Sequence, residues 1–269
     1  MSGPRNGGIT LNSSLQKSNS RKYLYGVIRC DRSDTLELSG VDNTSVYMMP
    51  CKLIAAVVSD VEREDFKNDI SALARHESVI ESLMESYSLL PARFGTVLQG
   101  DEHVMELLSS SYEQYSQGLQ KVENRVEFDL KVFWPAGELR SLIEQTDPYR
   151  TAFAELERKS GPSARYVLYK QRETVVTRIL KTKAEEQVSE IQRSLVPVCA
   201  QCRCEVMPSE GLMLDGAYLI ERVRCGEFRD IIESMQSSNV KFCFLLTGPW
   251  PPYNFMSLGN AMLKCVETT

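Results

Sequence analysis

The chain has 269 residues, of which 42% are hydrophobic and 25% charged, a composition typical of a folded protein and not of a disordered or fibrous one. Its 31 Lys and Arg against 36 Asp and Glu give a net charge of −5, which argues against a protein that holds nucleic acid through its phosphates. At roughly 150 residues per domain, the length predicts about two domains, with one large domain as the alternative.

Residues 1–21 are expected to be a disordered leader that lies outside the fold. They are rich in Gly, Ser and Asn and lack the apolar stretch of a signal peptide. A second stretch, 242–263, carries no charged residue, but Gly248-Pro249-Trp250-Pro251-Pro252 interrupts it. A membrane-spanning helix could not keep its backbone hydrogen bonds through this sequence. We therefore expect neither secretion nor a membrane span.

Three apolar runs predict strands in an N-terminal mixed α+β domain, which we place over residues 22–124. Residues 23–28 are rich in aromatic and β-branched types and predict the first strand. A polar stretch over 31–44 is expected to link it to a short strand at 46–48. The run 53–58 is apolar throughout, as is typical of a central strand buried on both faces.

Two helices are predicted between residues 65 and 119. Apolar residues recur every three or four positions over 65–90, and Pro91 is expected to end this helix. A short strand is predicted over 92–98, and the apolar stripe of a second helix follows over 104–119. The stripe of the first helix consists of Leu73, His76, Ile80, Leu83, Tyr87 and Leu90.

The second half of the chain predicts a ferredoxin-like domain over 125–247. Residues 126–133 alternate polar and apolar side chains, the pattern of a strand with one wet face. A long charged helical region follows as an insertion, and Pro197 closes it. Strands are then predicted at 204–207, 217–220 and 240–247, with a helix at 228–235. This is the split βαβ order. Residues 248–269 are expected to be an aromatic and proline-rich tail that packs back on the protein.

The sequence contains no recognisable catalytic motif. Phosphate loops, dinucleotide-binding turns and nucleophile elbows are absent, and His76-Glu77 lacks a second histidine because position 80 is Ile. The weak metal candidate is Cys199, Cys202 and Cys204, but a zinc site needs about four ligands and both histidines lie far upstream. We expect no enzymatic activity, no cofactor and no metal, and interpret these cysteines as free thiols.

Ferredoxin-like sheets also bind RNA, so this alternative must be considered. No strand carries the aromatic pattern of an RNA-binding sheet, and core packing explains Phe242 and Phe244 equally well. With the acidic composition, we expect no nucleic acid partner.

Two segments stand out as candidate contact sites. LLPARFGTV places Arg93 and Phe94 after a helix stop, and LTGPWPPYNF holds Trp250 and Tyr253 at the end of the last strand. A stiff aromatic and proline-rich segment loses little entropy on docking. It can therefore pack between domains or present an apolar contact to a partner. We favour interdomain packing, and all four residues remain candidates for partner binding.

The chain resembles the gas vesicle protein family GvpF/GvpL. The resemblance rests on Tyr23-Leu24-Tyr25-Gly26-Val27, on the run 53–59, on His76-Glu77-Ser78-Val79, and above all on LLPARFGTV paired with GPWPPYNF. These motifs occur in the family's order over residues 22–260. The resemblance implies the same two-domain α+β fold and an accessory protein for building gas vesicles, the protein-walled flotation compartments of some prokaryotes.

The resemblance also implies the partners and the location. They are the small hydrophobic shell protein GvpA and other gas vesicle accessory proteins, with no lipid membrane, at the gas vesicle and in the cytoplasm. Our hypothesis is nucleation or chaperone-like delivery of shell subunits. The alternatives are a structural minor component of the wall and, with less support, a metal- or RNA-binding ferredoxin-like protein.

Overall fold

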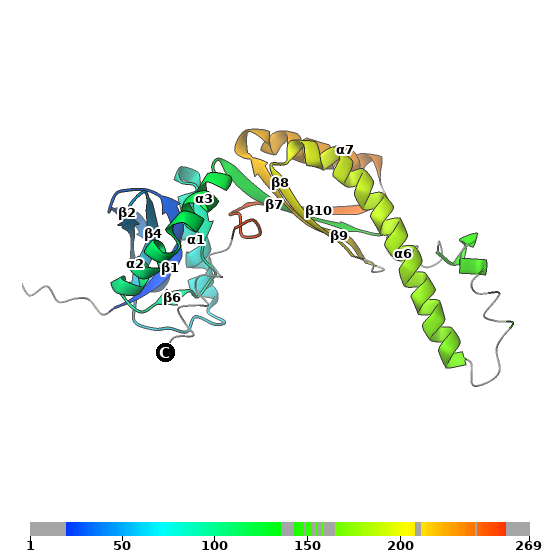
Figure 1. The fold of residues 1–269 in the computed structure, drawn as a ribbon, viewed down its shortest axis with the longest axis horizontal. Coiled ribbons are helices and arrows are strands. Elements are labelled where there is room, and N and C mark those ends of the chain that lie inside the picture. The colour runs from blue at the N-terminus through cyan, green and yellow to red at the C-terminus, as the bar shows by residue number, and fades with distance from the viewer. Residues whose placement is uncertain are drawn as a thin grey trace, which may run out of the picture.

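The computed structural model describes residues 20–135, 143–147, 149–151, 154, 158, 165–207, 211–239 and 241–256. The predicted leader up to residue 19, and the part of the predicted tail from residue 257 onward, lie outside these residues. Figure 1 shows two lobes, each built on one β-sheet, with a long helix, α6, that runs past the end of the second sheet.

The first lobe contains an antiparallel sheet of six strands in the order β2-β3-β4-β1-β5, with β6 pairing with β1. β1 and β4 occupy its centre, so residues 54–58 of the apolar run lie in a central strand as expected, whereas Leu53 precedes the strand and is 62% exposed. The strands are β1 (Arg21–Arg29), β2 (Thr35–Ser39), β3 (Ser45–Cys51), β4 (Ile54–Val61), β5 (Leu89–Pro91) and β6 (Val97–Leu98).

Helices cover both faces of this sheet. Helix α1 (Ile70–Ser86) packs on the face that Tyr23 and Tyr25 occupy, and α2 (Asp101–Ser110) and α3 (Tyr112–Lys121) pack on the face that Leu24 occupies. Alternate residues of β1 therefore enter two separate apolar cores, which explains why nearly every residue of this strand is buried.

Several predicted boundaries in this lobe were wrong. The polar stretch 31–44 contains the edge strand β2 and a 3-10 turn, Val41–Asn43. The single helix predicted through 104–119 is two helices, because the backbone of Ser111 leaves the helical region at φ −114° and ψ 17°. Helix α1 ends at Ser86, well before Pro91, since residues from Leu89 onward pair with β1.

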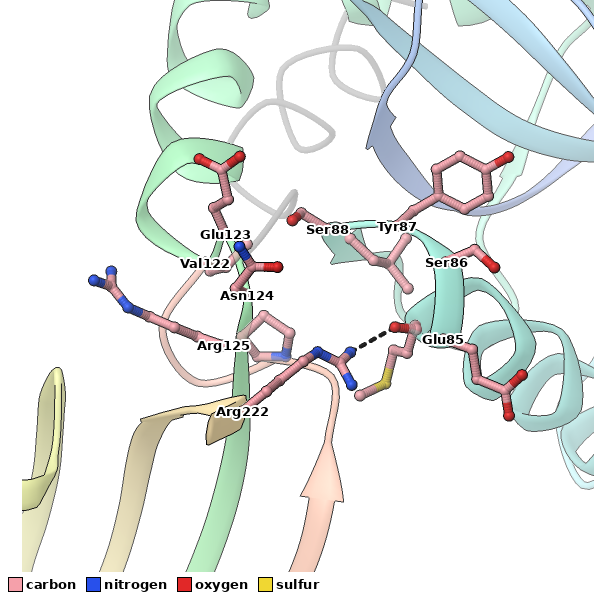
Figure 2. Close-up of a pocket in the computed structure, with 12 residues that line it drawn as sticks. Glu85, Ser86, Tyr87, Ser88, Val122, Glu123, Asn124, Arg125 and Arg222 are labelled. Carbon is pink, nitrogen blue, oxygen red and sulfur yellow. Dashed lines mark hydrogen bonds between the residues drawn. The ribbon is translucent and has the colours of Figure 1, made fainter. Parts of the chain in front are cut away.

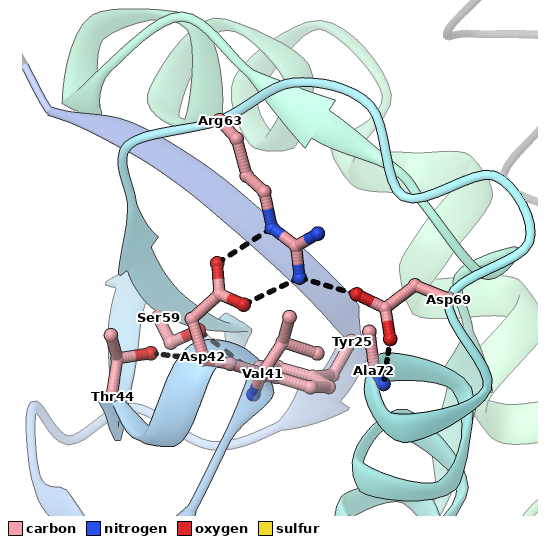
Figure 3. A network of polar contacts seen from close by, with 8 residues as sticks. All are labelled: Tyr25, Val41, Asp42, Thr44, Ser59, Arg63, Asp69 and Ala72. Atoms are coloured by element: carbon pink, nitrogen blue, oxygen red, sulfur yellow. Dashed lines mark hydrogen bonds and ion pairs between the residues drawn. The ribbon is translucent and has the colours of Figure 1, made fainter.

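The start of α1 is fixed by a charged network (Figure 3). The carboxylate of Asp69 accepts a hydrogen bond from the backbone N–H of Ala72 and so caps the helix. Arg63 donates to Asp69 and also to Asp42, which joins the helix start to the 3-10 turn after β2. Behind this network the Tyr25 hydroxyl contacts Ser59 and accepts from the Val41 N–H. Local capping thus explains why the helix begins later than the apolar pattern suggests.

Gly26 allows β5 to approach β1 closely. A Cβ at this position would lie 2.6 Å from the Leu90 carbonyl oxygen and 2.7 Å from a Leu89 methyl group. Gly26→Ala is therefore expected to lower the free energy of unfolding by about 2 kcal/mol, because backbone atoms cannot move aside as side chains do. Urea unfolding measures this. The control is Gly226→Ala, where an added Cβ meets nothing within 4 Å. Equal effects of the two variants would contradict the explanation.

The second lobe contains an antiparallel sheet in the order β10-β7-β9-β8. The predicted succession of strand, helix, strand, strand, helix, strand is observed; the first three strands are longer than expected, and the last is shifted from 240–247 to 243–250. The elements are β7 (Arg125–Phe133), α6 (Arg165–Leu195), the 3-10 turn Val196–Val198, β8 (Gln201–Val206), β9 (Leu212–Glu221), the 3-10 turn Arg222–Arg224, α7 (Cys225–Ser238) and β10 (Cys243–Trp250).

Both helices of the second lobe lie on the same face of its sheet (Figure 1). The side chains of Val126, Phe128, Leu130 and Val132 point into the core beneath them, where the Phe128 ring lies 5.5 Å from that of Phe228 on α7. The alternate residues of β7, from Glu127 onward, therefore occupy the opposite face. This second face carries the features that concern function.

Candidate functional site

The C-terminal segment runs through the junction between the two lobes. Strand β10 continues beyond the predicted end at 247 as far as Trp250, which pairs with Glu127 of β7. The chain then turns through Pro251 and Pro252, both buried, and reaches Met256. We call residues 251–256 the strap.

The strap is anchored to the first lobe by Tyr253 and Met256. The ring of Tyr253 packs against the core formed by Tyr23 and α1, and burial raises the pKa of its hydroxyl, as do Glu77 and Tyr23 nearby. Met256 packs against the core on the other face of the first sheet, close to Gly118 of α3. The strap therefore contacts both apolar cores of the first lobe.

Asn254 and Phe255 anchor the strap to the second lobe. The backbone N–H of Asn254 donates to one carboxylate oxygen of Glu127 at 2.8 Å, and its side-chain amide donates to the other at 2.6 Å. Phe255 is buried against Ala217 and Leu219 of β9, with the Arg203 guanidinium 5.6 Å from its ring centre. One short segment thus joins two lobes that are otherwise separate sheets.

Glu127 is a carboxyl group buried at this junction. Only 1% of its surface is exposed. Burial raises its pKa to about 7, Asp129 adds to this effect, and the hydrogen bonds from Asn254 and the charge of Arg203 oppose it. A carboxyl group with this pKa changes its charge near neutral pH. Glu127 was not among the residues predicted from the sequence, because it lies at a polar position of an alternating strand and looks solvent-facing.

The segment LLPARFGTV lies beside the same core as Tyr253. The Tyr23 hydroxyl lies 3.0 Å from Nδ1 of His76 and accepts the Gly95 N–H at 3.0 Å. Phe94 packs edge-on against His76, with ring centres 5.7 Å apart. The motifs containing Tyr23, His76, Phe94 and Tyr253 are thus brought together around one aromatic cluster.

His76 is fully buried in this cluster. Burial lowers its pKa to about 4, although the nearby Ala92 backbone acts in the opposite direction. The imidazole is therefore neutral at pH 7 and contributes to core packing and to the hydrogen bond with Tyr23. A buried neutral histidine of this kind is a source of pH dependence.

The four predicted contact residues occupy different environments. Phe94 and Tyr253 are partly buried against the aromatic cluster, whereas Arg93 is exposed in the turn between β5 and β6. The strand predicted over 92–98 is wrong for Arg93 and Phe94, since β6 begins only at Val97. Trp250 lies on β10 with 37% of its surface exposed, and its indole N–H donates to the Thr247 hydroxyl. The structure thus joins Phe94 and Tyr253 in one cluster and places Trp250 in the second sheet.

A polar pocket of about 180 Å³ opens beside the junction. Figure 2 shows Arg222 extending from the end of β9 toward the end of α1, where it donates to the Met84 carbonyl. The connection between α3 and β7 forms another wall, with Asn124 and Arg125, and Pro252 of the strap completes the lining. The hydrogen bond from Arg222 to the Met84 carbonyl is thus a second link between the lobes.

The three clustered cysteines do not form a metal centre of the zinc type. Cys202 and Cys204 are exposed on β8, and Cys199, directly after the 3-10 turn Val196–Val198, donates its thiol hydrogen to the Leu195 carbonyl. Within the residues that the structure describes, no group of three or more His, Cys, Asp or Glu could hold a metal ion. No helix among them is long and apolar enough to span a membrane.

Together these features define a two-lobed α+β protein whose own C-terminal strap joins the lobes. The chain belongs to the family described as gas vesicle synthesis protein GvpL/GvpF, whose sequence model matches residues 21–257. This confirms the resemblance drawn from the sequence motifs. The protein is thus a member of a prokaryotic gas vesicle family.

Individual relatives and solved structures agree with this family assignment. The chain is 24% identical to gas vesicle protein L1 of Halobacterium salinarum, over 94% of this chain and 95% of that protein. It is 25% identical to gas vesicle protein F of a Streptomyces species, over 87% and 98% of the two chains. The crystal structure of GvpF from an Anabaena species superposes with a TM-score of 0.74 at 23% identity, over 88% of this chain and 98% of that one. None of these names describes an enzymatic activity.

Proposed function

We propose that this protein is an accessory factor of gas vesicle assembly that binds the small hydrophobic shell protein GvpA and holds or delivers its subunits before they join the wall. Membership of the gas vesicle family over residues 21–257 carries this proposal. The protein would act in the cytoplasm and at the growing vesicle, together with other accessory proteins. Aggregation of a hydrophobic subunit is prevented when its apolar surface is covered until assembly.

We place the contact surface on the open face of the second sheet. Leu245 pairs with Lys131 and Trp250 with Glu127, so both side chains lie on the face opposite to α6 and α7. Leu245 is 49% exposed and Trp250 is 37% exposed, on the edge strand of the sheet. Large exposed apolar side chains on one strand suit a partner with an apolar surface.

The other predicted contact residues have different roles in this proposal. Phe94 and Tyr253 pack against the aromatic cluster and position the strap, so their substitution would act through the fold. Arg93 is exposed on the first lobe and is retained as a second contact candidate. Trp250 remains the best test of direct binding, because it can be truncated without opening a core.

The proposal includes a division into two domains, 22–124 and 125–247, of which the second is ferredoxin-like. Its succession of elements and its strand order β10-β7-β9-β8, with all neighbours antiparallel, support this description. In this proposal the strap belongs to both domains and fixes their relative position.

Trp250→Ala is expected to reduce recovery of co-expressed GvpA by about tenfold or more in a pull-down, as expected for a central apolar contact. The free energy of unfolding should change by about 1 kcal/mol or less, because the indole is already partly in water. Recovery is measured against an unrelated acidic protein of similar size, and stability by urea unfolding.

The matched control is Val223→Ala, since Val223 is 90% exposed and lies in the 3-10 turn after β9, not on β10. It should retain full binding. Wild-type recovery no higher than that of the unrelated protein, with GvpA shown to be present and soluble, would refute the binding role. Equal recovery with Trp250→Ala and wild type would refute the proposed surface.

A further inference from the structure

Two thiols lie side by side on an exposed edge strand of the second sheet. Cys202 and Cys204 are two residues apart on β8, so their side chains share one face of the strand. Both are exposed, and β8 has a neighbour, β9, on one side only. The pair is therefore accessible from solvent.

The sulfur of Cys204 is held in place by polar groups beneath it. The Gln192 side-chain amide of α6 donates to Cys204 Sγ at 2.8 Å and to the Tyr218 hydroxyl at 2.8 Å. Tyr218, a fully buried residue of β9, thus shares its Gln192 donor with Cys204, and both side chains border Gly216. The Gln192 amide therefore fixes the direction of the Cys204 sulfur, as a partner behind a metal ligand does.

Gly216 provides the space that this sulfur occupies. Gly216 is the cross-strand neighbour of Cys204, and a Cβ there would lie 3.0 Å from Cys204 Sγ and 2.9 Å from the Tyr218 ring. Any side chain at position 216 would compete with the sulfur for this space. The sequence feature that looked like ordinary free thiols thus forms a defined pair.

The pair is poorly suited to a disulfide and to zinc. Residues i and i+2 of a strand have Cα atoms about 6.6 Å apart with parallel Cβ directions, near the limit of roughly 6.8 Å for a disulfide. Zinc needs about four ligands. Cys199 lies near but donates its thiol hydrogen to the Leu195 carbonyl at 2.8 Å. A soft monovalent ion is stable with two thiolates and prefers sulfur to oxygen.

We propose that Cys202 and Cys204 form a two-sulfur binding site for a soft, thiophilic metal ion, with Cu(I) as the representative ion. On binding, two sulfur–metal bonds form and both thiols release their protons to solvent. No change of oxidation state is required. Gln192 and Tyr218 are positioning residues that orient Cys204.

The test is an anaerobic titration of the full chain with Cu(I) in competition with a chromophoric Cu(I) chelator. Wild type should withdraw one ion per chain into this site. Cys202→Ser and Cys204→Ser should each weaken Cu(I) binding by more than about 100-fold. Loss of a residue that only hydrogen-bonds to a metal ligand typically weakens binding by roughly 10–100-fold, so the larger effect identifies a ligand. The matched control is Cys243→Ser, an exposed cysteine of β10, which should leave the affinity unchanged.

The pH dependence distinguishes a thiol pair from a single adventitious thiol. Because two protons are displaced, the affinity should fall about 100-fold for each pH unit of acidification, compared with about tenfold for one thiol. Circular dichroism confirms that each variant is folded. The proposal would be overturned by a one-proton dependence, by equal affinity of wild type and Cys204→Ser, or by a loss in Cys199→Ser as large as that in Cys202→Ser.

Discussion

Asn254→Ala is expected to lower the free energy of unfolding by about 3 kcal/mol, because it removes a donor from a buried carboxyl group. Asn254 supplies both hydrogen bonds to Glu127, one from its backbone and one from its side chain, and Glu127 is 1% exposed. The alanine variant keeps the backbone donor but leaves one carboxylate oxygen without its partner. Urea unfolding measures the loss.

A double variant tests whether the pair explains this loss. The double variant Glu127→Leu/Asn254→Ala removes both partners. Its loss in free energy of unfolding should be smaller than that of Asn254→Ala alone, since no unpaired polar group remains. The control is Asn239→Ala, because Asn239 is exposed and its side chain donates only to a carbonyl at the end of its own helix. A loss from Asn254→Ala no larger than from Asn239→Ala would mean that the strap does not depend on Glu127.

The same variant tests the proposed division into domains. If the strap holds two domains together, weakening it should separate the unfolding of the lobes into two transitions. Fluorescence of Trp134, which lies in the core of the second lobe, and far-ultraviolet circular dichroism would then give different midpoints. Coincident midpoints in Asn254→Ala would argue for one cooperative unit.

Two buried groups are expected to give large and opposite contributions to the pH dependence of stability. The pKa of His76 is lowered from 6.5 to about 4 by burial, so its contribution is complete above pH 6.5 and is lost as the pH falls toward 4. The pKa of Glu127 is raised from 4.5 to about 7, so its contribution is complete below pH 4.5 and is lost as the pH rises toward 7. Each amounts to about 3 kcal/mol, since one pKa unit corresponds to about 1.4 kcal/mol.

These contributions nearly cancel between pH 4.5 and 6.5 in wild type, and single variants should reveal them. As the pH falls from 7 to 4.5, the free energy of unfolding of wild type should rise by about 3 kcal/mol relative to that of Glu127→Gln. As the pH falls from 6.5 to 4, the free energy of unfolding of wild type should decrease by a similar amount relative to that of His76→Gln. Urea unfolding at a series of pH values measures both differences. A flat difference for Glu127→Gln would show that this carboxyl titrates near its ordinary pKa in the folded protein.

Much of the fold was predictable because it depends on local pattern. The apolar run at 53–58 predicted a central strand, and the alternation at 126–133 predicted a strand with its core side chains at even positions. His76 was placed correctly on the buried side of α1. Leu73, assigned to the same stripe, is 40% exposed, whereas Ala72, four residues before His76, is buried in its place.

The candidate site was predictable only in part. The motifs containing Phe94 and Tyr253 were recognised as unusual, and packing between the lobes was favoured for the second segment. Their meeting on one aromatic cluster could not be deduced, since they lie far apart in sequence and each looks like an isolated turn. Glu127 was missed for the same reason, because its partner Asn254 is 127 positions away.

The sequence by itself determined the family, most of the order of strands and helices and most of their buried faces, because these follow from motifs and from periodicity within short stretches. Tertiary structure alone decided which segments meet: β2 at the sheet edge, the strap between the lobes, the buried Glu127 and the thiol pair on β8. Contacts between residues far apart in the chain depend on how whole elements pack, and a local pattern of polar and apolar residues does not contain that information.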